Sequence, residues 1–218
     1  MVDRRELMEL VRELGLHANV VEKDYVLGWL LAGISQHPAL GPAWIFKGGT
    51  CLNKCYFETY RFSEDLDFTL VEAERLEEEF LVAAFREVAD WVYEEAGIEL
   101  PRETIRFEVY ANPRGGVSAA GRIGYRGPLQ PQGDLPRVRF DLTADEVLVL
   151  EPISRTVHHP YSDVPAGGIQ VLTYCFEEVF AEKVRALAER MRPRDLHDVI
   201  HLYRHDDLRP DRPLVLET

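Results

Sequence analysis

The sequence predicts an α+β fold in which helices open the chain, a group of strands follows, and two further helices close it. Two observations support this class. Apolar residues recur at helical spacing near both ends of the chain, while the middle contains short segments in which polar and apolar residues alternate. We expect the strands to form one mixed sheet, with the last two helices as a C-terminal addition.

Two helices are expected before the first strand. Residues 7–14 carry Leu and Val at helical spacing, interrupted by charged residues. A second helix is predicted from residue 21 to about residue 34. His37-Pro38 should end it, because the residue before a proline is pushed out of the helical region.

The first strand is predicted from the apolar run 43–46, which enters a tight turn at Gly48-Gly49. Thr50 is a suitable cap for a helix that continues to about residue 57. Residues 65–70 alternate polar and apolar side chains, which is typical of a strand with one face in the core.

A long amphipathic helix is predicted next, with apolar residues stepping along one face from Leu76 to Trp91. Further strands are expected at 105–110, 122–125, 138–143 and 147–150. The closing helices should run from 174 to about 189 and from 193 to about 203, the second with Pro193 at its first position.

Length and composition indicate one soluble, cytoplasmic functional unit. The 218 residues suffice for one sizeable core, and no stretch approaches the ~20 apolar residues of a membrane span. The charged first helix is unlike a secretory signal. The three cysteines, Cys51, Cys55 and Cys175, cannot all pair and lie in no CxxC motif, which favours a reducing compartment.

The net charge of −13 argues against non-specific binding of nucleic acid, because neutralisation of phosphates supplies that affinity. Local concentrations of basic residues keep specific binding open. They lie at Lys47, Lys54 and Arg61 and at Lys183, Arg185, Arg190, Arg192 and Arg194. Charge alone is equally compatible with an acidic protein that carries scattered arginines.

The strongest local signal is a glycine turn, Gly48-Gly49, followed after one short helix by Asp65-Leu66-Asp67. In a strand the two aspartates share a face and lie ~7 Å apart, close enough to hold divalent cations. Mg²⁺ prefers carboxylates and lowers the pKa of an attacking hydroxyl. Glycine N–H groups before a helix can approach a phosphate. Either motif alone is weak, but the combination predicts a metal-bound nucleotide.

Two further residues, Lys183 and Asp141, are candidates on their own chemistry. Lys183 falls inside the apolar stripe of its helix, so it either extends to the edge of the stripe or meets an anion in a polar cleft. Asp141 shares a strand face with Arg139 and Thr143 and is either a general base or an ordinary edge aspartate.

Asp195 and Asp198 share one face of the last predicted helix, opposite an apolar stripe formed by Leu196, Val199, Ile200 and Tyr203. Asp195 can simply complement the helix dipole, an effect that has faded at Asp198. The same helix suggests a second possibility, since His197, His201 and His205 recur every four residues and two such histidines can bind Zn²⁺. The intervening aspartate is too short for the general-base glutamate of zinc proteases, so we place little weight on zinc.

These motifs together resemble the AbiEii/AbiGii toxin family, nucleotidyltransferases that include the MenT toxins. The resemblance spans most of the chain, thins in the middle and at the C-terminus, and is carried by residues 21–25, 46–50, 61–68, Glu182-Lys183, Arg190 and 194–198. It implies a polymerase-β-like core. It also implies a toxin of a toxin–antitoxin pair, with relatives that add nucleotides to the 3′ end of tRNA.

The resemblance assigns roles to the candidate residues. Catalytic roles are expected for Asp65, Asp67, Lys183, Asp198 and Asp141, and nucleotide binding for Lys47, Gly48, Gly49, Thr50, Ser63 and Asp195. Asp65 and Asp67 would bind Mg²⁺ or Mn²⁺, with an NTP as substrate. The lysine of the helix that contains Lys183 contacts triphosphate in the family, and Asp198 rather than Asp195 is favoured as the last functional acid. Ser63 would contact phosphates or be phosphorylated, although a turn cap explains it equally well.

The resulting hypothesis is an Mg-dependent nucleotidyltransferase with a core at 1–150 and a helical part at 151–218 that completes the active-site cleft. Its expected partners are tRNA or another RNA acceptor and a cognate antitoxin protein, with no membrane. Two alternatives stay open. One is transfer of a nucleotidyl or phosphoryl group to a protein or small molecule, and the other is a non-catalytic binding module.

Overall fold

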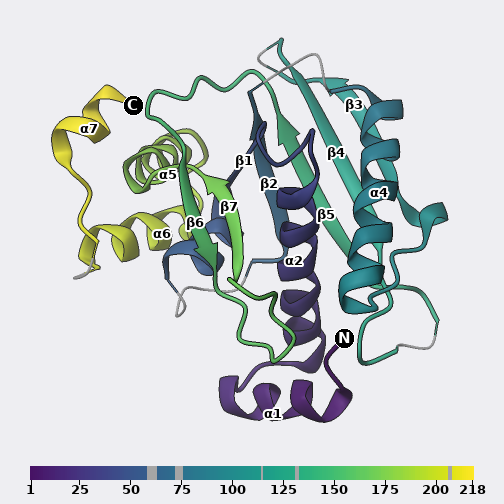
Figure 1. Cartoon of the computed structure of the whole chain (residues 1–218). Helices are drawn as coiled ribbons and strands as arrows, with labels where there is room; N and C mark the ends of the chain where they lie inside the picture. The colour runs from purple at the N-terminus through teal and green to yellow at the C-terminus, as the bar shows by residue number, and fades with distance from the viewer. Residues whose placement is uncertain (58–62, 72–75, 114, 131–132, 206–207) are drawn as a thin grey trace. The chain divides into compact units, whose positions relative to one another are not determined.

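The computed structural model describes residues 1–218 except 58–62, 72–75, 114, 131–132 and 206–207 (Figure 1). Arg61 and Phe62, two residues of the family-like motif, lie outside the described residues, as does the side chain of Arg194. The chain divides into two compact units. The first contains 1–146 and 154–172, and the second contains 147–153 and 173–218.

The first unit is built on a seven-stranded mixed sheet, so the prediction of a mixed sheet is confirmed. The strand order is β3-β4-β5-β2-β1-β7-β6. The strands are β1 (Trp44–Lys47), β2 (Asp65–Leu70), β3 (Arg106–Ala111), β4 (Val117–Gly124), β5 (Arg137–Thr143), β6 (Ile153–Val157) and β7 (Ile169–Thr173). β2 is antiparallel to β1 and parallel to β5.

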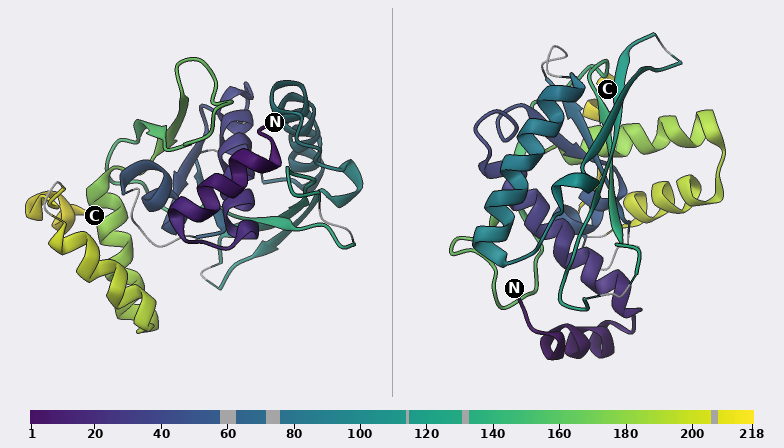
Figure 2. Two further views of the ribbon diagram at one scale, coloured as in Figure 1. Left: turned by 90° about the horizontal axis from the view of Figure 1, so that it is seen from below. Right: turned by 90° about the vertical axis from the view of Figure 1, so that its right-hand side faces the viewer.

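The helices of the first unit, among its described residues, are α1 (Arg4–Leu14), α2 (Ala18–Gln36), α3 (Gly48–Cys51), the π-helix η1 (Leu52–Tyr56), α4 (Glu78–Ala96) and the short 3-10 helix η3 (Arg102–Thr104). Figure 2 shows α2 and α4 on one face of the strands. Their buried side chains form one core with the inward residues of the sheet, and Phe85 of α4 packs 4.9 Å from Phe140 of β5 between ring centroids.

The second unit contains three helices among its described residues: α5 (Phe176–Arg190), α6 (Pro193–Arg204) and α7 (Arg212–Glu217). The predicted starts of the two closing helices agree with α5 and α6 to within two residues, with Pro193 in the first turn of α6. The helix α7 was not predicted.

Two structural predictions are wrong, and two strands were missed. Residues 147–150 form no strand, because the N–H groups of Val149 and Leu150 donate to the Glu178 carboxylate at 3.4 and 2.9 Å instead of to a neighbouring strand. Thr50 is not a helix cap, since α3 already begins at Gly48. The strands β6 and β7 were not predicted.

Candidate active site

Three neighbouring strands bring the predicted acids together. Asp67 of β2 stands opposite Lys47 of β1 on one side and opposite Asp141 of β5 on the other. Asp65 pairs in register with Arg139. A row of one cation and two carboxylates therefore crosses the centre of the sheet, with a third carboxylate two residues away.

The alternation along β2 decides which face carries this row. Leu66 and Phe68 are fully buried in the apolar core, at 0% and 1% exposure, while Asp65 and Asp67, which alternate with them, are half-buried. Successive side chains of a strand point to opposite faces. The carboxylates consequently lie on the face away from the core cluster, as the sequence predicted.

Gly48 brings the turn directly against Asp67. Its φ of +79° lies in the left-handed region, and a Cβ at this position would come within 2.9 Å of the Asp67 carboxyl carbon. Only glycine meets both conditions. The glycine turn and the acid-bearing strand thus form one local unit, which is the arrangement that the combined motif predicts.

Two of the predicted nucleotide-binding hydroxyls differ in their surroundings. Thr50 is buried, and its hydroxyl donates to the backbone carbonyl of Asp65 at 2.5 Å, so it ties α3 to the start of β2. Ser63 is half-buried just before that strand. Gly49 is buried within α3. Phosphate contacts by these residues stay predictions, and for Thr50 the structure shows a positioning role instead.

Lys47 is held in a polar network that the sequence did not reveal. Its buried ammonium forms an ion pair with Glu146 and donates to the Thr143 hydroxyl at 3.3 Å. The Thr69 hydroxyl donates to the same Glu146 carboxylate at 2.9 Å. Nucleotide binding through the Lys47 ammonium would require this ion pair to open.

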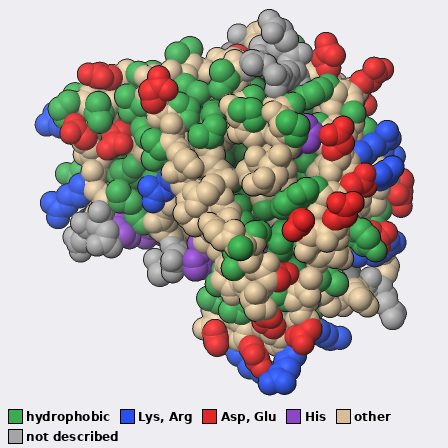
Figure 3. Space-filling view, in the orientation of Figure 1, with side chains coloured by type: hydrophobic (Ala, Val, Ile, Leu, Met, Phe, Trp, Pro, Cys, Tyr) green, Lys and Arg blue, Asp and Glu red, His purple; other side chains and the backbone are tan. Residues whose placement is uncertain are grey.

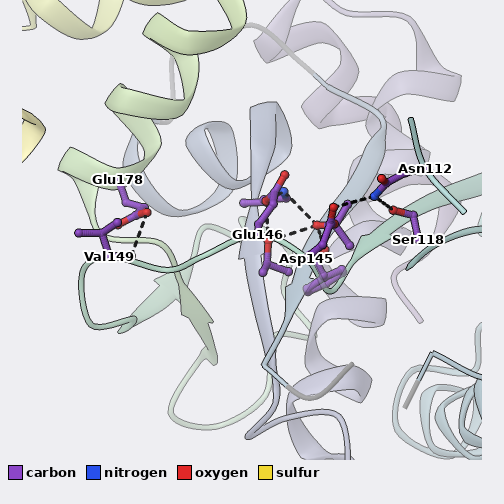
Figure 4. A network of polar contacts seen from close by, with 10 residues as sticks. Asn112, Ser118, Asp145, Glu146, Val149 and Glu178 are labelled. Atoms are coloured by element: carbon purple, nitrogen blue, oxygen red, sulfur yellow. Dashed lines mark hydrogen bonds and ion pairs between the residues drawn. The ribbon is translucent and has the colours of Figure 1, made fainter. Parts of the chain in front are cut away.

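The segment after β5 anchors this network (Figure 4). Glu146 follows Asp145, whose carboxylate accepts a hydrogen bond from the Asn112 amide at 2.8 Å, and the same amide reaches the Ser118 hydroxyl at 3.1 Å. Glu146 therefore belongs to the site although it lies in no recognisable motif. Glu146 lies in a loop that is far in sequence from Lys47, so no spacing between residues identifies it.

The electrostatics of the row affect Asp141. Burial and the negative charge of Asp65 raise its pKa above the usual aspartate range, while Arg139 and Lys47 oppose this shift. A raised pKa is typical of carboxylates that lie close to like charges, and such sites are frequently functional.

A second polar cluster fixes the strand that carries the acids. The Lys23 ammonium of α2 pairs with Glu64, the residue before Asp65, at 2.8 Å. The neighbouring Asp24 pairs with the buried Lys54 of η1 at 2.7 Å. These contacts connect α2 to the residue before Asp65 and to η1. Lys47 and Lys54 are both buried and paired with carboxylates, so they do not offer the exposed charge that we expected of this basic cluster.

The remaining predicted residues lie in the second unit. Lys183 of α5 forms an ion pair with Asp198 of α6 at 3.3 Å, so the anion that this lysine meets is a carboxylate of its own unit. Asp198 is fully buried, and Asp195 is 3% exposed with Arg190 4.0 Å away. The functional roles of all three residues stay predictions.

The apolar stripe of α6 is not packed as expected. Leu196, Ile200 and Tyr203 are 48%, 42% and 69% exposed, whereas the two aspartates point inward with Leu202. The expectation of a packed stripe is wrong because the Lys183–Asp198 pair turns the acidic face towards α5.

The carboxylates of β2 suit a metal ion, although the described residues form no complete set of metal ligands by themselves. Within the described ranges, no group of three or more His, Cys, Asp or Glu is arranged to hold an ion, and this includes the histidines of α6. A nucleotide-bound Mg²⁺ needs only one or two carboxylates, because phosphate oxygens and waters complete its shell. Asp65 and Asp67 on one strand face provide that pair. Among the described helices, none is long and apolar enough to cross a membrane.

Comparison with known proteins adds a family and a fold. The sequence model of the family described as "Nucleotidyl transferase AbiEii toxin, Type IV TA system" matches residues 29–218. No curated protein matches the chain in sequence. Among solved structures, JHP933 from Helicobacter pylori is similar with a TM-score of 0.59 and 16% identity, over 93% of this chain and 73% of that chain. At this identity the similarity concerns the fold alone.

Proposed function

Because this chain belongs to the AbiEii nucleotidyltransferase toxin family of type IV toxin–antitoxin systems, we propose that it transfers a nucleotide from an NTP to an RNA acceptor, the 3′ end of tRNA. The observation that supports this most directly is the row of Lys47, Asp67 and Asp141 beside the Gly48 turn. The polymerase-β-like character of the core is part of the same proposal.

In the proposed reaction the 3′ hydroxyl oxygen of the RNA attacks the α-phosphorus of the NTP. A new phosphodiester bond forms, the bond to the β-phosphate oxygen breaks, and pyrophosphate leaves. Asp141, whose raised pKa brings it closer to neutrality, accepts the hydroxyl proton. The N–H groups of Gly48 and Gly49 bind phosphate oxygens.

Asp65 and Asp67 would hold Mg²⁺ or Mn²⁺, which when bound would neutralise charge on the triphosphate and lower the pKa of the attacking hydroxyl. Thr50 keeps Asp65 in place through its hydrogen bond. Lys183 neutralises charge on the triphosphate, which requires it to leave Asp198. Ser63 and Asp195 contribute to nucleotide binding.

Labelled NTP and purified tRNA test this proposal. Asp65→Ala and Asp67→Ala should abolish incorporation of label into RNA. Asp134→Asn is the control, because Asp134 is an exposed aspartate that is not among the proposed site residues. Persistent transfer in either alanine variant overturns the assignment. In cells, expression of the wild-type chain in the cytoplasm should arrest growth, and the Asp67→Ala substitution should relieve the arrest. The antitoxin partner should do the same when co-expressed.

Metal binding is measured separately. Mg²⁺ that binds the folded state raises the unfolding temperature in proportion to the logarithm of its concentration. We expect this rise for wild-type protein and its loss in Asp65→Asn/Asp67→Asn. An equal rise in both would place the ion elsewhere.

A second candidate function is transfer of the nucleotide or phosphoryl group to a protein or small molecule. The net charge of −13 favours it, because an acidic protein repels RNA. Incubation of the enzyme and labelled NTP with tRNA, antitoxin protein and both together separates the two functions, since label only on RNA removes this candidate. Any transfer of label by the enzyme excludes the alternative that the chain is a non-catalytic binding module.

A further inference from the structure

The second unit contains a groove that combines arginines with apolar side chains. Its volume is about 740 Å³, and residues of α5, α6, α7 and the α6–α7 connection line it. Three of the lining residues are Arg204, Arg209 and Arg212, and no acid is among the described lining residues. In sequence these arginines alternate with Asp206, Asp207 and Asp211, so the positive character belongs to the described lining side chains and not to the segment as a whole.

The floor and edge of the groove are apolar or aromatic. Phe180 of α5 is 8% exposed and Val215 of α7 is half-buried, so both support the floor. Tyr203, at the end of α6, is 69% exposed. Figure 3 shows basic, acidic and apolar side chains next to one another over α6 and α7.

From these side chains we infer that the groove binds a single-stranded RNA segment of the acceptor. Proteins that hold single strands combine guanidinium groups, which contact successive phosphates, with aromatic rings on which bases stack. The arginines and Tyr203 supply both elements within one cavity, and the volume is within the range of sites for ligands of nucleotide size.

The exposed ring of Tyr203 favours RNA over the other anionic ligand that fits the groove, an acidic amphipathic peptide. Guanidinium groups pair with phosphates and carboxylates alike, whereas an exposed tyrosine ring offers a flat face on which a base can stack. Identification of the polymer as RNA rests on the proposed function, whereas the groove and its charge do not.

Binding is measured by fluorescence anisotropy of a labelled single-stranded RNA oligonucleotide, without NTP or divalent metal. Tyr203→Ala should weaken binding about fivefold or more, the lower end of what base–aromatic stacking contributes, and Tyr203→Phe should retain it. Arg204→Glu/Arg212→Glu should weaken binding and reduce the salt dependence by ~0.7 per lost phosphate contact. These side chains are exposed, and circular dichroism checks that each variant is folded.

The matched control is Arg4→Glu/Arg12→Glu, which makes the same change of charge on two exposed arginines of α1. It should bind RNA as tightly as the wild type. Binding that is unchanged in Tyr203→Ala, or that falls equally in the α1 control, overturns the inference. The inference is also overturned if the groove binds an acidic peptide while these variants leave the affinity for RNA unchanged. Tyr203-dependent RNA binding by a protein that never transfers a nucleotide supports the groove and removes the proposed reaction.

Discussion

Gly48 and Asp67 share so little space that neither can change independently. A methyl group at Gly48 would overlap the Asp67 carboxylate, and the φ of +79° is unfavourable for any L side chain. Gly48→Ala should therefore displace a proposed metal ligand by a fraction of an ångström or more. Small displacements of this kind can cost about a hundredfold in rate.

The expected result is a loss of NTP transfer of that order, measured on tRNA, with the circular dichroism spectrum retained. Gly15→Ala is a matched control, because Gly15 also has a positive φ, +65°, but has no heavy atom within 4 Å of the added methyl group. Equal losses in both variants would assign the effect to backbone strain rather than to Asp67.

Asp141 should make stability depend on pH in a defined direction. Its pKa is raised in the folded protein, so folding favours the protonated form, and its ionisation destabilises the fold as pH rises above the ordinary aspartate value of about 3.9. Asp141→Asn removes that penalty. The variant should gain unfolding temperature over the wild type at neutral pH, and the gain should shrink as pH falls.

Thermal unfolding of both proteins at several pH values checks this prediction. If Asp141 also acts as the base, the same variant loses transfer at every pH. A variant that gains stability equally at acidic and neutral pH would contradict the raised pKa.

At the level of single residues, the sequence is informative where chemistry and spacing are local. Asp65, Asp67 and Gly48 are recognisable because strand alternation and a glycine turn place them within one short stretch. Glu146 is not recognisable, since only the pairing of β5 with β2 brings its loop to Lys47.

Among the helices, α5 and α6 depend on one buried ion pair. Asp198 is 0% exposed in its side chain and Lys183 is 12% exposed. Removal of one partner of a buried pair leaves an uncompensated charge and typically lowers the free energy of unfolding by about 3–5 kcal/mol. We expect a loss of about this size for Lys183→Met, and urea denaturation measures it.

The double variant Lys183→Met/Asp198→Asn should regain most of the lost stability, because no unpaired charge remains. A cost below about 1 kcal/mol for Lys183→Met would instead resemble a solvent-exposed pair. It would mean that the lysine is free to move to a triphosphate at little energetic cost.

Strand prediction failed at the C-terminal side for a physical reason. The segment 147–150 has a strong strand composition, yet Val147 is 82% exposed and its neighbours bond to Glu178. By contrast, β6 is mostly exposed and lacks a clear alternation, but it pairs at the edge of the sheet. Strand formation depends on an available partner, which intrinsic preference does not encode.

For the whole molecule, the net charge of −13 predicts that salt stabilises the fold. Repulsion between like charges opposes folding, and a physiological ionic strength shortens the screening length to about 8 Å. The unfolding temperature in calorimetry should rise with NaCl from low to physiological concentration. A fall would mean that attractive pairs such as Lys47–Glu146 dominate.

Glu94→Gln/Glu95→Gln provides a comparison. Both acids are exposed in the last turn of α4, where negative charge also opposes the helix dipole. The variant should be more stable at low salt and show a smaller rise.

The position of Asp65 and Asp67 on β2, between β1 and β5, has a consequence for how errors in folding are tolerated. A shift of this strand by a single residue against either neighbour would direct both carboxylates into the hydrocarbon interior and expel Leu66 and Phe68 into water. Misaligned sheets are thereby penalised by the very residues that would bind the nucleotide. A chain that reaches a stable sheet has, for the same reason, already assembled its acidic pair.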